Sequence, residues 1–268
     1  MIRAGIVLAL ALVANACATP SMPVNAPPGI ATELAPSGTL RAAINYGNPI
    51  LASKDPATGE PRGVSVDLSR ELARRLGVPL ELVTYDAAGK VTANATTGAW
   101  DIAFVAIDPK RAADMDYSAP YVLIEGAFVV PQGSPIRAND DVDREGVRVV
   151  AAKGSAYDLY LAREFKKATI VHVATSQEVV AAMVAQRIDA GAGVKQQLEA
   201  SARTIPGVRL LDGRFMVIQQ AMATPKGRPA GARYLAAFVE DMKAAGFVAE
   251  ALRNHGIDGA AVAPPAAR

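Results

Sequence analysis

A basic pair follows directly on an apolar run in the segment WDIAFVAIDPKRAADMDYSAPYV, residues 100–122. The run ends at Asp108-Pro109, and Lys110 and Arg111 come next. Because proline cannot donate a hydrogen bond to a sheet, we expect a strand to stop here. Open α/β sheets bind ligands beyond the carboxyl ends of their strands. The pair therefore indicates either an ordinary turn or a binding site for an anion.

A second segment with possible chemistry is Gly154-Ser155-Ala156, which is expected to join a strand to a helix. Glycine allows close backbone approach, and a helix start has unpaired N–H groups and a positive dipole end. An anion could therefore bind here. Ser155 could equally be only an N-cap, with Asp158 as its capping-box partner. The two interpretations are compatible, because a cap leaves other N–H groups free.

Periodicity predicts the elements that position these residues. The four-residue spacing of Leu68, Leu72 and Leu76 predicts a helix over 63–78. Other helices are predicted at 155–165, 176–188, 195–205 and 232–256, and a short one after residue 85. Strands are predicted at 38–47, 79–85, 101–107, 125–131, 146–152, 168–174, 189–194 and 216–225. The alternation is typical of an α/β fold with largely parallel sheets.

Two such runs predict two lobes with a cleft between them. Lobe 1 comprises 38–125 and 225–262, and lobe 2 comprises 126–224. Two crossover segments, near 126–132 and 216–224, serve as hinges.

The N-terminus has the pattern of a secretory signal peptide, residues 1–17: Arg3, an apolar run and small residues before Cys17. A membrane anchor that stays attached is the alternative. Cys17 could carry a lipid, although Ala14 stands where a lipobox usually has Leu, or the chain could be cut after Ala16. Either cut predicts export to the periplasm. Residues 18–37 are rich in Pro, Ala and Ser, which predicts a tether.

In order and spacing, these segments resemble the extracellular solute-binding proteins of family 3, which serve ABC importers of polar amino acids and related solutes. The resemblance rests on GTLRAAINYGNPI, GVSVDLSRELARRLG, the segment 100–122, VVAAKGSAYDLYL and QRIDAGAGV. It implies a two-lobed type II periplasmic binding fold that closes by hinge bending around a small anionic or zwitterionic ligand. It further implies a monomer that delivers this ligand to an ABC permease in the inner membrane.

The resemblance also assigns roles in binding. Arg111 matches the arginine that clamps the ligand's α-carboxylate, and a planar guanidinium suits a carboxylate because it offers paired donors. Ser155 and Ala156 would contact the ligand from lobe 2. Tyr46 and Asn45 lie where similar proteins place a stacking aromatic, although a core Tyr46 is the alternative.

The departures from the family pattern concern the ligand's ammonium group. The acid expected after IDA falls near Val194, and Gln196, which follows, is a further candidate contact. Ala106 replaces a serine. Asp108 replaces a threonine and could supply the missing acid or only cap the turn. Because a buried ammonium needs a paired acid, the sequence predicts an organic anion or an amino acid held in an altered way.

Other function classes have weaker support in the sequence. A net charge of +2 gives no field for nucleic acid. No metal-ligand cluster or cofactor motif is present, and neither His172 nor His255 lies beside a plausible nucleophile. An enzyme of the cyclohexadienyl dehydratase kind would need a general acid such as Glu125 or Asp108. A ligand-sensing module is a further alternative.

Overall fold

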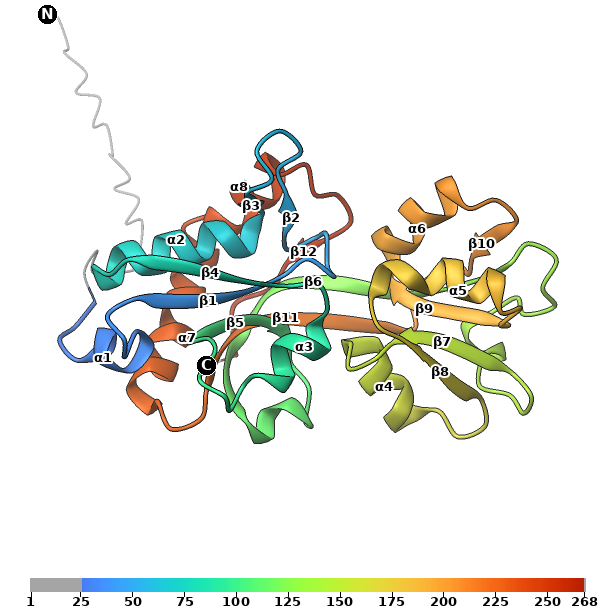
Figure 1. The fold of residues 1–268 in the computed structure, drawn as a ribbon, viewed down its shortest axis with the longest axis horizontal. Helices are drawn as coiled ribbons and strands as arrows, with labels where there is room; N and C mark the ends of the chain where they lie inside the picture. Colours follow the sequence, from blue (N-terminus) through green and yellow to red (C-terminus); the bar gives the residue numbers. More distant parts are fainter. Residues whose placement is uncertain (1–25, 268) are drawn as a thin grey trace, which may run out of the picture.

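The computed structural model describes residues 26–267, which form a mixed α/β fold around one large sheet (Figure 1). Its strand order is β4 (Leu80–Tyr85), β1 (Leu40–Asn45), β5 (Ile102–Ala106), β11 (Met216–Pro225), β6 (Met115–Pro131), β9 (Ala190–Val194), β7 (Arg148–Ala152) and β8 (Thr169–Val173). β10 (Val208–Leu210) and β12 (Ala261–Val262) pair with β6, and β2 (Ser53–Lys54) pairs with β3 (Pro61–Arg62).

The sheet confirms the predicted two-lobed architecture with two crossovers. Strands β4, β1 and β5 are parallel in lobe 1, and β8, β7 and β9 are parallel in lobe 2. β6 and β11 join the two halves and pair antiparallel with each other and with their neighbours, so the sheet is mixed where largely parallel pairing was expected. The lobe boundaries given above stay a prediction.

The strand predicted at 125–131 is only the second half of β6, which begins at Met115. Pro120 argues against a strand in the first half, because proline lacks a donor. The structure accommodates it at an irregularity: the register of β6 with β11 shifts on both sides of Ala221, which lies opposite Pro120. A bulge of this kind absorbs the missing hydrogen bond.

Helices cover the sheet in both lobes (Figure 1). Those of lobe 1 are α1 (Ile30–Leu34), α2 (Val64–Leu76), α3 (Ala88–Ala93), α7 (Pro229–Ala244) and α8 (Phe247–Asn254). Those of lobe 2 are α4 (Ala156–Glu164), α5 (Val179–Ala185) and α6 (Lys195–Thr204). In α2 the predicted leucine stripe is buried, and Gly77 ends the helix in a left-handed conformation with φ 67°.

The N-terminal predictions meet the structure only in part. The signal peptide over 1–17 and Cys17 lie outside the described residues. Within the predicted tether at 18–37, α1 is folded, and Leu34 is fully buried and packs near Gly231 of α7. The last part of that segment therefore belongs to lobe 1. No helix among residues 26–267 is long and apolar enough to cross a membrane.

Candidate functional site

A small cavity lies between the lobes, with a volume of about 30 Å³. Its walls come from the ends of β1 and β5, from the start of α4, and from β9 and β11. This volume is far below the roughly 300–1,000 Å³ of pockets that enclose small molecules, so the lobes lie close together around it. Among the residues that line the cavity, Arg111 is the only one with a charged side chain.

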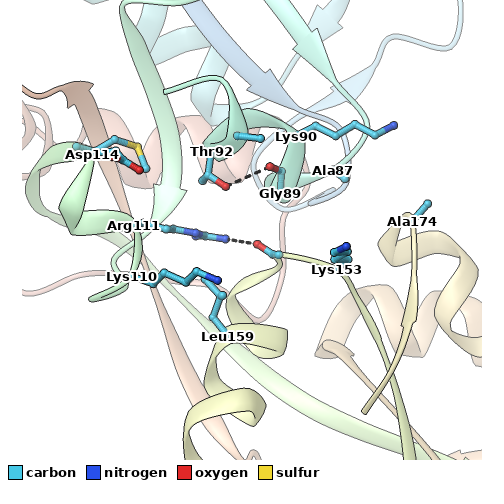
Figure 2. A pocket seen from close by; sticks show the side chains of 13 residues that line it. Ala87, Gly89, Lys90, Thr92, Lys110, Arg111, Asp114, Lys153, Leu159 and Ala174 are labelled. Carbon is cyan, nitrogen blue, oxygen red and sulfur yellow. Dashed lines mark hydrogen bonds between the residues drawn. The ribbon is translucent and has the colours of Figure 1, made fainter. Parts of the chain in front are cut away.

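Arg111 spans the two lobes through its guanidinium. Nη1 donates to the Ala106 carbonyl of lobe 1 at 3.0 Å, and Nη2 donates to the Gly154 carbonyl of lobe 2 at 2.8 Å (Figure 2). Nε is buried and has no hydrogen-bond partner in the described chain. A guanidinium has five N–H donors. Two are used here, which leaves three without a hydrogen-bond partner in the described chain.

The electrostatic environment of Arg111 favours an anionic partner. Its side chain is only 4% exposed, and burial lowers the pKa of the guanidinium from its ordinary value. Tyr117, Asp108 and Asp158 oppose that shift only from a distance. No carboxylate within residues 26–267 lies in salt-bridge range of Arg111. A buried cation without a counter-ion is costly, and a bound anion would remove that cost.

The lobes come close together at Gly89 of α3 and Gly154 of lobe 2. A Cβ on Gly89 would lie 2.5 Å from the Lys153 carbonyl oxygen. A Cβ on Gly154, whose φ is +72°, would lie 2.9 Å from the Gly89 Cα. Only glycine at both positions allows this approach, which brings the Gly154 carbonyl within reach of Arg111.

Ser155 caps the start of α4 as the sequence predicts, but the capping box with Asp158 does not form, because Asp158 accepts from Gly154 N and not from Ser155 N. Ser155 Oγ accepts a hydrogen bond from Asp158 N at 3.1 Å, and Asp158 Oδ2 accepts from Gly154 N at 2.7 Å. His172 Nε2 lies 2.7 Å from the other carboxylate oxygen of Asp158. Ser155 and Ala156 both line the cavity. N–H groups in the first turn of a helix have no carbonyl partner within the helix, so they can bind a ligand while the cap is in place.

Asp108 does not line the cavity. Its Oδ1 accepts from Lys110 N at 2.9 Å, which is the turn-capping role named as one alternative. Its Oδ2 lies 3.3 Å from Arg163 Nη1 of α4, across the cleft. The suggestion that Asp108 supplies the missing acid is therefore not supported, because its carboxylate already has two other partners.

The remaining predicted contacts divide into two groups. Asn45 and Ala106 line the cavity, and Val194 lines it too, with an apolar side chain. Tyr46 and Gln196 are not among the lining residues. Tyr46 instead accepts a hydrogen bond at its carbonyl oxygen from Gln177 Nε2, and Gln196 Nε2 donates to the Asp258 carbonyl.

Sequence reasoning missed several polar residues in the cavity wall, namely Asn48, Ser176 and Gln220. Gln220 is 6% exposed, and its Oε1 is buried without a hydrogen-bond partner in the described chain. A signal was present, because the pair Gln219-Gln220 interrupts the otherwise apolar strand MVIQQAMATP. Buried polar atoms in proteins are almost always hydrogen-bonded, so this acceptor needs a donor, which a ligand could supply.

Comparison with known proteins agrees with this arrangement. Residues 40–256 match the bacterial extracellular solute-binding proteins, family 3. The glutamine-binding protein of Geobacillus stearothermophilus is 24% identical over 183 residues, which are 66% of this chain and 69% of that protein.

Two solved structures illustrate the likeness in fold. One is an ancestral amino acid-binding protein described as a precursor of cyclohexadienyl dehydratase, with a TM-score of 0.69, 24% identity and coverage of 83% of this chain and 97% of that one. The other is the amino acid ABC transporter substrate-binding protein AbpA from Streptococcus pneumoniae bound to L-arginine, with a TM-score of 0.70, 19% identity and coverage of 83% and 96%. The matched sequence pattern covers most of the chain, and the cavity lies between two lobes joined by β6 and β11, so the protein belongs to the bacterial extracellular solute-binding proteins of family 3.

Proposed function

We propose that this protein is the exported solute-binding component of an ABC importer and captures a small carboxylate-bearing solute between its lobes. The observation that carries the proposal is Arg111, a buried guanidinium at the cavity with no carboxylate partner in the described chain. The family and the similarity to a glutamine-binding protein support a solute of amino acid size. The loaded form would be delivered to a membrane permease.

The ligand class follows from the charges around the cavity. The resemblance places the family's ammonium-binding acid at or near Val194, and no residue that lines the cavity carries a carboxylate. Desolvating an ammonium without a paired acid is unfavourable. We therefore expect an organic anion, or an amino acid whose ammonium group is not held by a carboxylate of the cavity.

Binding requires movement, because a cavity of about 30 Å³ is far smaller than the roughly 300–1,000 Å³ of pockets that enclose small molecules. A solute of several non-hydrogen atoms can enter only when the lobes open, and the lining side chains must shift around it. On closure the three unused N–H donors of Arg111 would bind the carboxylate, while the start of α4 completes the site from lobe 2.

Mass spectrometry of the small molecules that co-purify with the protein is the direct test, with Arg111→Ala alongside the wild type. Loss of the compound in the variant supports the carboxylate clamp, and equal retention contradicts it. Calorimetry with matched pairs, such as L-alanine against propionate and L-glutamine against glutarate, tests the ligand class. Tight binding of the amino acids without binding of the plain carboxylates would contradict the organic-anion proposal.

A dehydratase is the second candidate, because one similar structure is described as a precursor of such an enzyme. Its general acid would have to be protonated near neutral pH. Hydrogen bonds from Lys195 and Arg214, at 2.9 and 3.0 Å, lower the pKa of Glu125. Glu125 is therefore poorly suited to donate a proton, which favours binding over catalysis. Turnover of prephenate by the purified protein would instead favour the dehydratase.

A further inference from the structure

A second and larger space borders Arg111. This outer groove has a volume of about 490 Å³ and runs between α3 and the Lys110 segment of lobe 1 on one side and the turn before α4 on the other. In Figure 2, Lys90, Lys110 and Lys153 lie around the groove, and Arg111 reaches the Gly154 carbonyl. None of these three lysines lines the small cavity.

The charges of the outer groove are unbalanced. Four cationic side chains line it, and Asp114 is the only acid among the lining residues. Lys90 pairs with Asp86 at 2.8 Å. No carboxylate in the described chain pairs with the side chain of Lys110 or Lys153.

Nearby acids neutralise the groove only in part. Asp114 lines it, and Asp158 keeps its negative charge beside Gly154. These acids are fewer than the cations Lys110, Lys153 and Arg111, which have no carboxylate partner in the described chain. Asp108 accepts from Lys110 N and pairs with Arg163, and Asp158 is bound by Gly154 N and His172. Arg111 adds a buried charge whose Nε has no partner. The outer groove therefore holds excess positive charge, part of it shielded from water.

Lobe closure adds to this excess charge. Lys153 belongs to lobe 2, whereas Lys90, Lys110 and Arg111 belong to lobe 1, so closing the cleft brings like charges together. An anion in the groove would replace this repulsion by attraction to both lobes. A ligand that contacts both lobes binds the closed form more tightly than the open form and so shifts the equilibrium toward closure.

We propose that the outer groove binds a small multivalent anion, a phosphate or a polycarboxylate, which bridges the lobes and stabilises the closed form. Both kinds of anion carry several acceptor oxygens and more than one negative charge. Such an anion can contact several cations at once, and the cations of the groove come from separate segments. This site goes beyond the proposed capture of a solute in the small cavity, because its lysines do not face that cavity.

Calorimetric titration of inorganic phosphate and of citrate, each against chloride at equal ionic strength, tests the proposal on the full mature chain. The informative variant is Lys110→Ala with Lys153→Ala. Its control, Arg253→Ala with Lys167→Ala, removes the same charge from exposed positions, one in each lobe and both outside the groove. Thermal unfolding monitors the fold of both, and we expect no loss because the four side chains are exposed.

We expect phosphate or citrate to bind the wild type and the control, and to bind the groove variant about tenfold more weakly, which corresponds to losing two solvent-exposed ionic contacts. Whether phosphate or citrate binds shows whether the groove takes a phosphate or a polycarboxylate. The radius of gyration from X-ray scattering should fall on adding that anion to the wild type and not to the groove variant. An equal response to chloride, or equal binding by variant and control, would overturn the proposal.

The result is separable from the proposed function. The groove variant should still bind the co-purified solute in phosphate-free buffer, because neither lysine lines the small cavity. If Arg111→Ala retains that solute while the groove variant loses its response to the multivalent anion, the carboxylate clamp fails and the groove proposal stands.

Discussion

Gly89→Ala should affect the stability of lobe 1 and the closure of the cleft in opposite directions. Gly89 lies within α3, and its φ is outside the left-handed region, so alanine fits the helix and should stabilise it by about 1 kcal/mol. In the closed form, however, the new Cβ would lie 2.5 Å from the Lys153 carbonyl oxygen. A backbone atom cannot rotate away as a side chain can, so the lobes must move apart.

The size of the effect follows from the geometry. Ordinary van der Waals contact begins at 3.4 Å. The backbones at Gly89 and Lys153 must therefore move apart by 0.9 Å to accommodate the new Cβ. The bond from Arg111 Nη2 to the Gly154 carbonyl, now 2.8 Å, would then exceed hydrogen-bonding range. A hydrogen bond from a charged donor contributes about 1.5–3 kcal/mol. A cost of about 2 kcal/mol to the closed form predicts solute binding about 30-fold weaker.

The assay is calorimetry with whichever compound of the matched pairs binds the wild type, together with urea unfolding of the free protein. Gly133→Ala is the control, since a Cβ there meets no atom within 4 Å. We expect Gly89→Ala to bind weakly and to unfold at equal or higher urea. Binding within threefold of the wild type would refute the role of this backbone contact in closure.

Three further substitutions test neighbouring steps of the argument. Val194→Asp places an acid at the cavity, so it should destabilise the free protein by about 1–3 kcal/mol. It should also raise the affinity for L-alanine relative to propionate. If calorimetry gives an unchanged ratio of these two affinities, the position does not face the ligand's ammonium. Asp108→Asn should change solute affinity by less than about fivefold, because Asp108 does not line the cavity and an amide oxygen can still accept from Lys110 N. Loss of amino acid binding would assign Asp108 to the ammonium instead. Lys195 and Arg214 lower the pKa of Glu125, so its ionised form stabilises the fold above its unfolded pKa, and this contribution disappears as the pH falls through the lowered folded pKa. Glu125→Gln should therefore be less stable than the wild type in urea at pH 7 and equal to it in strong acid, whereas a difference independent of pH would contradict the ion pairs.

Local rules predicted much of the site from the sequence. The strand stop before Arg111, the Ser155 cap and the helix start of lobe 2 depend on neighbouring residues, and the structure has all three. The same holds for α2, whose leucine spacing needs no tertiary information.

Contacts between the lobes could not be predicted in this way. The bond of Arg111 to the Gly154 carbonyl, the pairing of Asp108 with Arg163 and the placement of Gln220 in the cavity wall join segments distant in sequence. The length of β6 was missed because Pro120 is tolerated only where the register with β11 shifts. Nothing in the local pattern indicates that shift.

The central claim is that Arg111 holds a carboxylate between the lobes. Its most direct test is the affinity of Arg111→Lys, measured by calorimetry with the compound that co-purifies with the wild type. Lysine retains the charge but loses the planar pair of donors, so we predict binding weaker by about tenfold or more. Unchanged affinity in Arg111→Lys, together with unchanged retention of the compound by Arg111→Ala, would contradict the account.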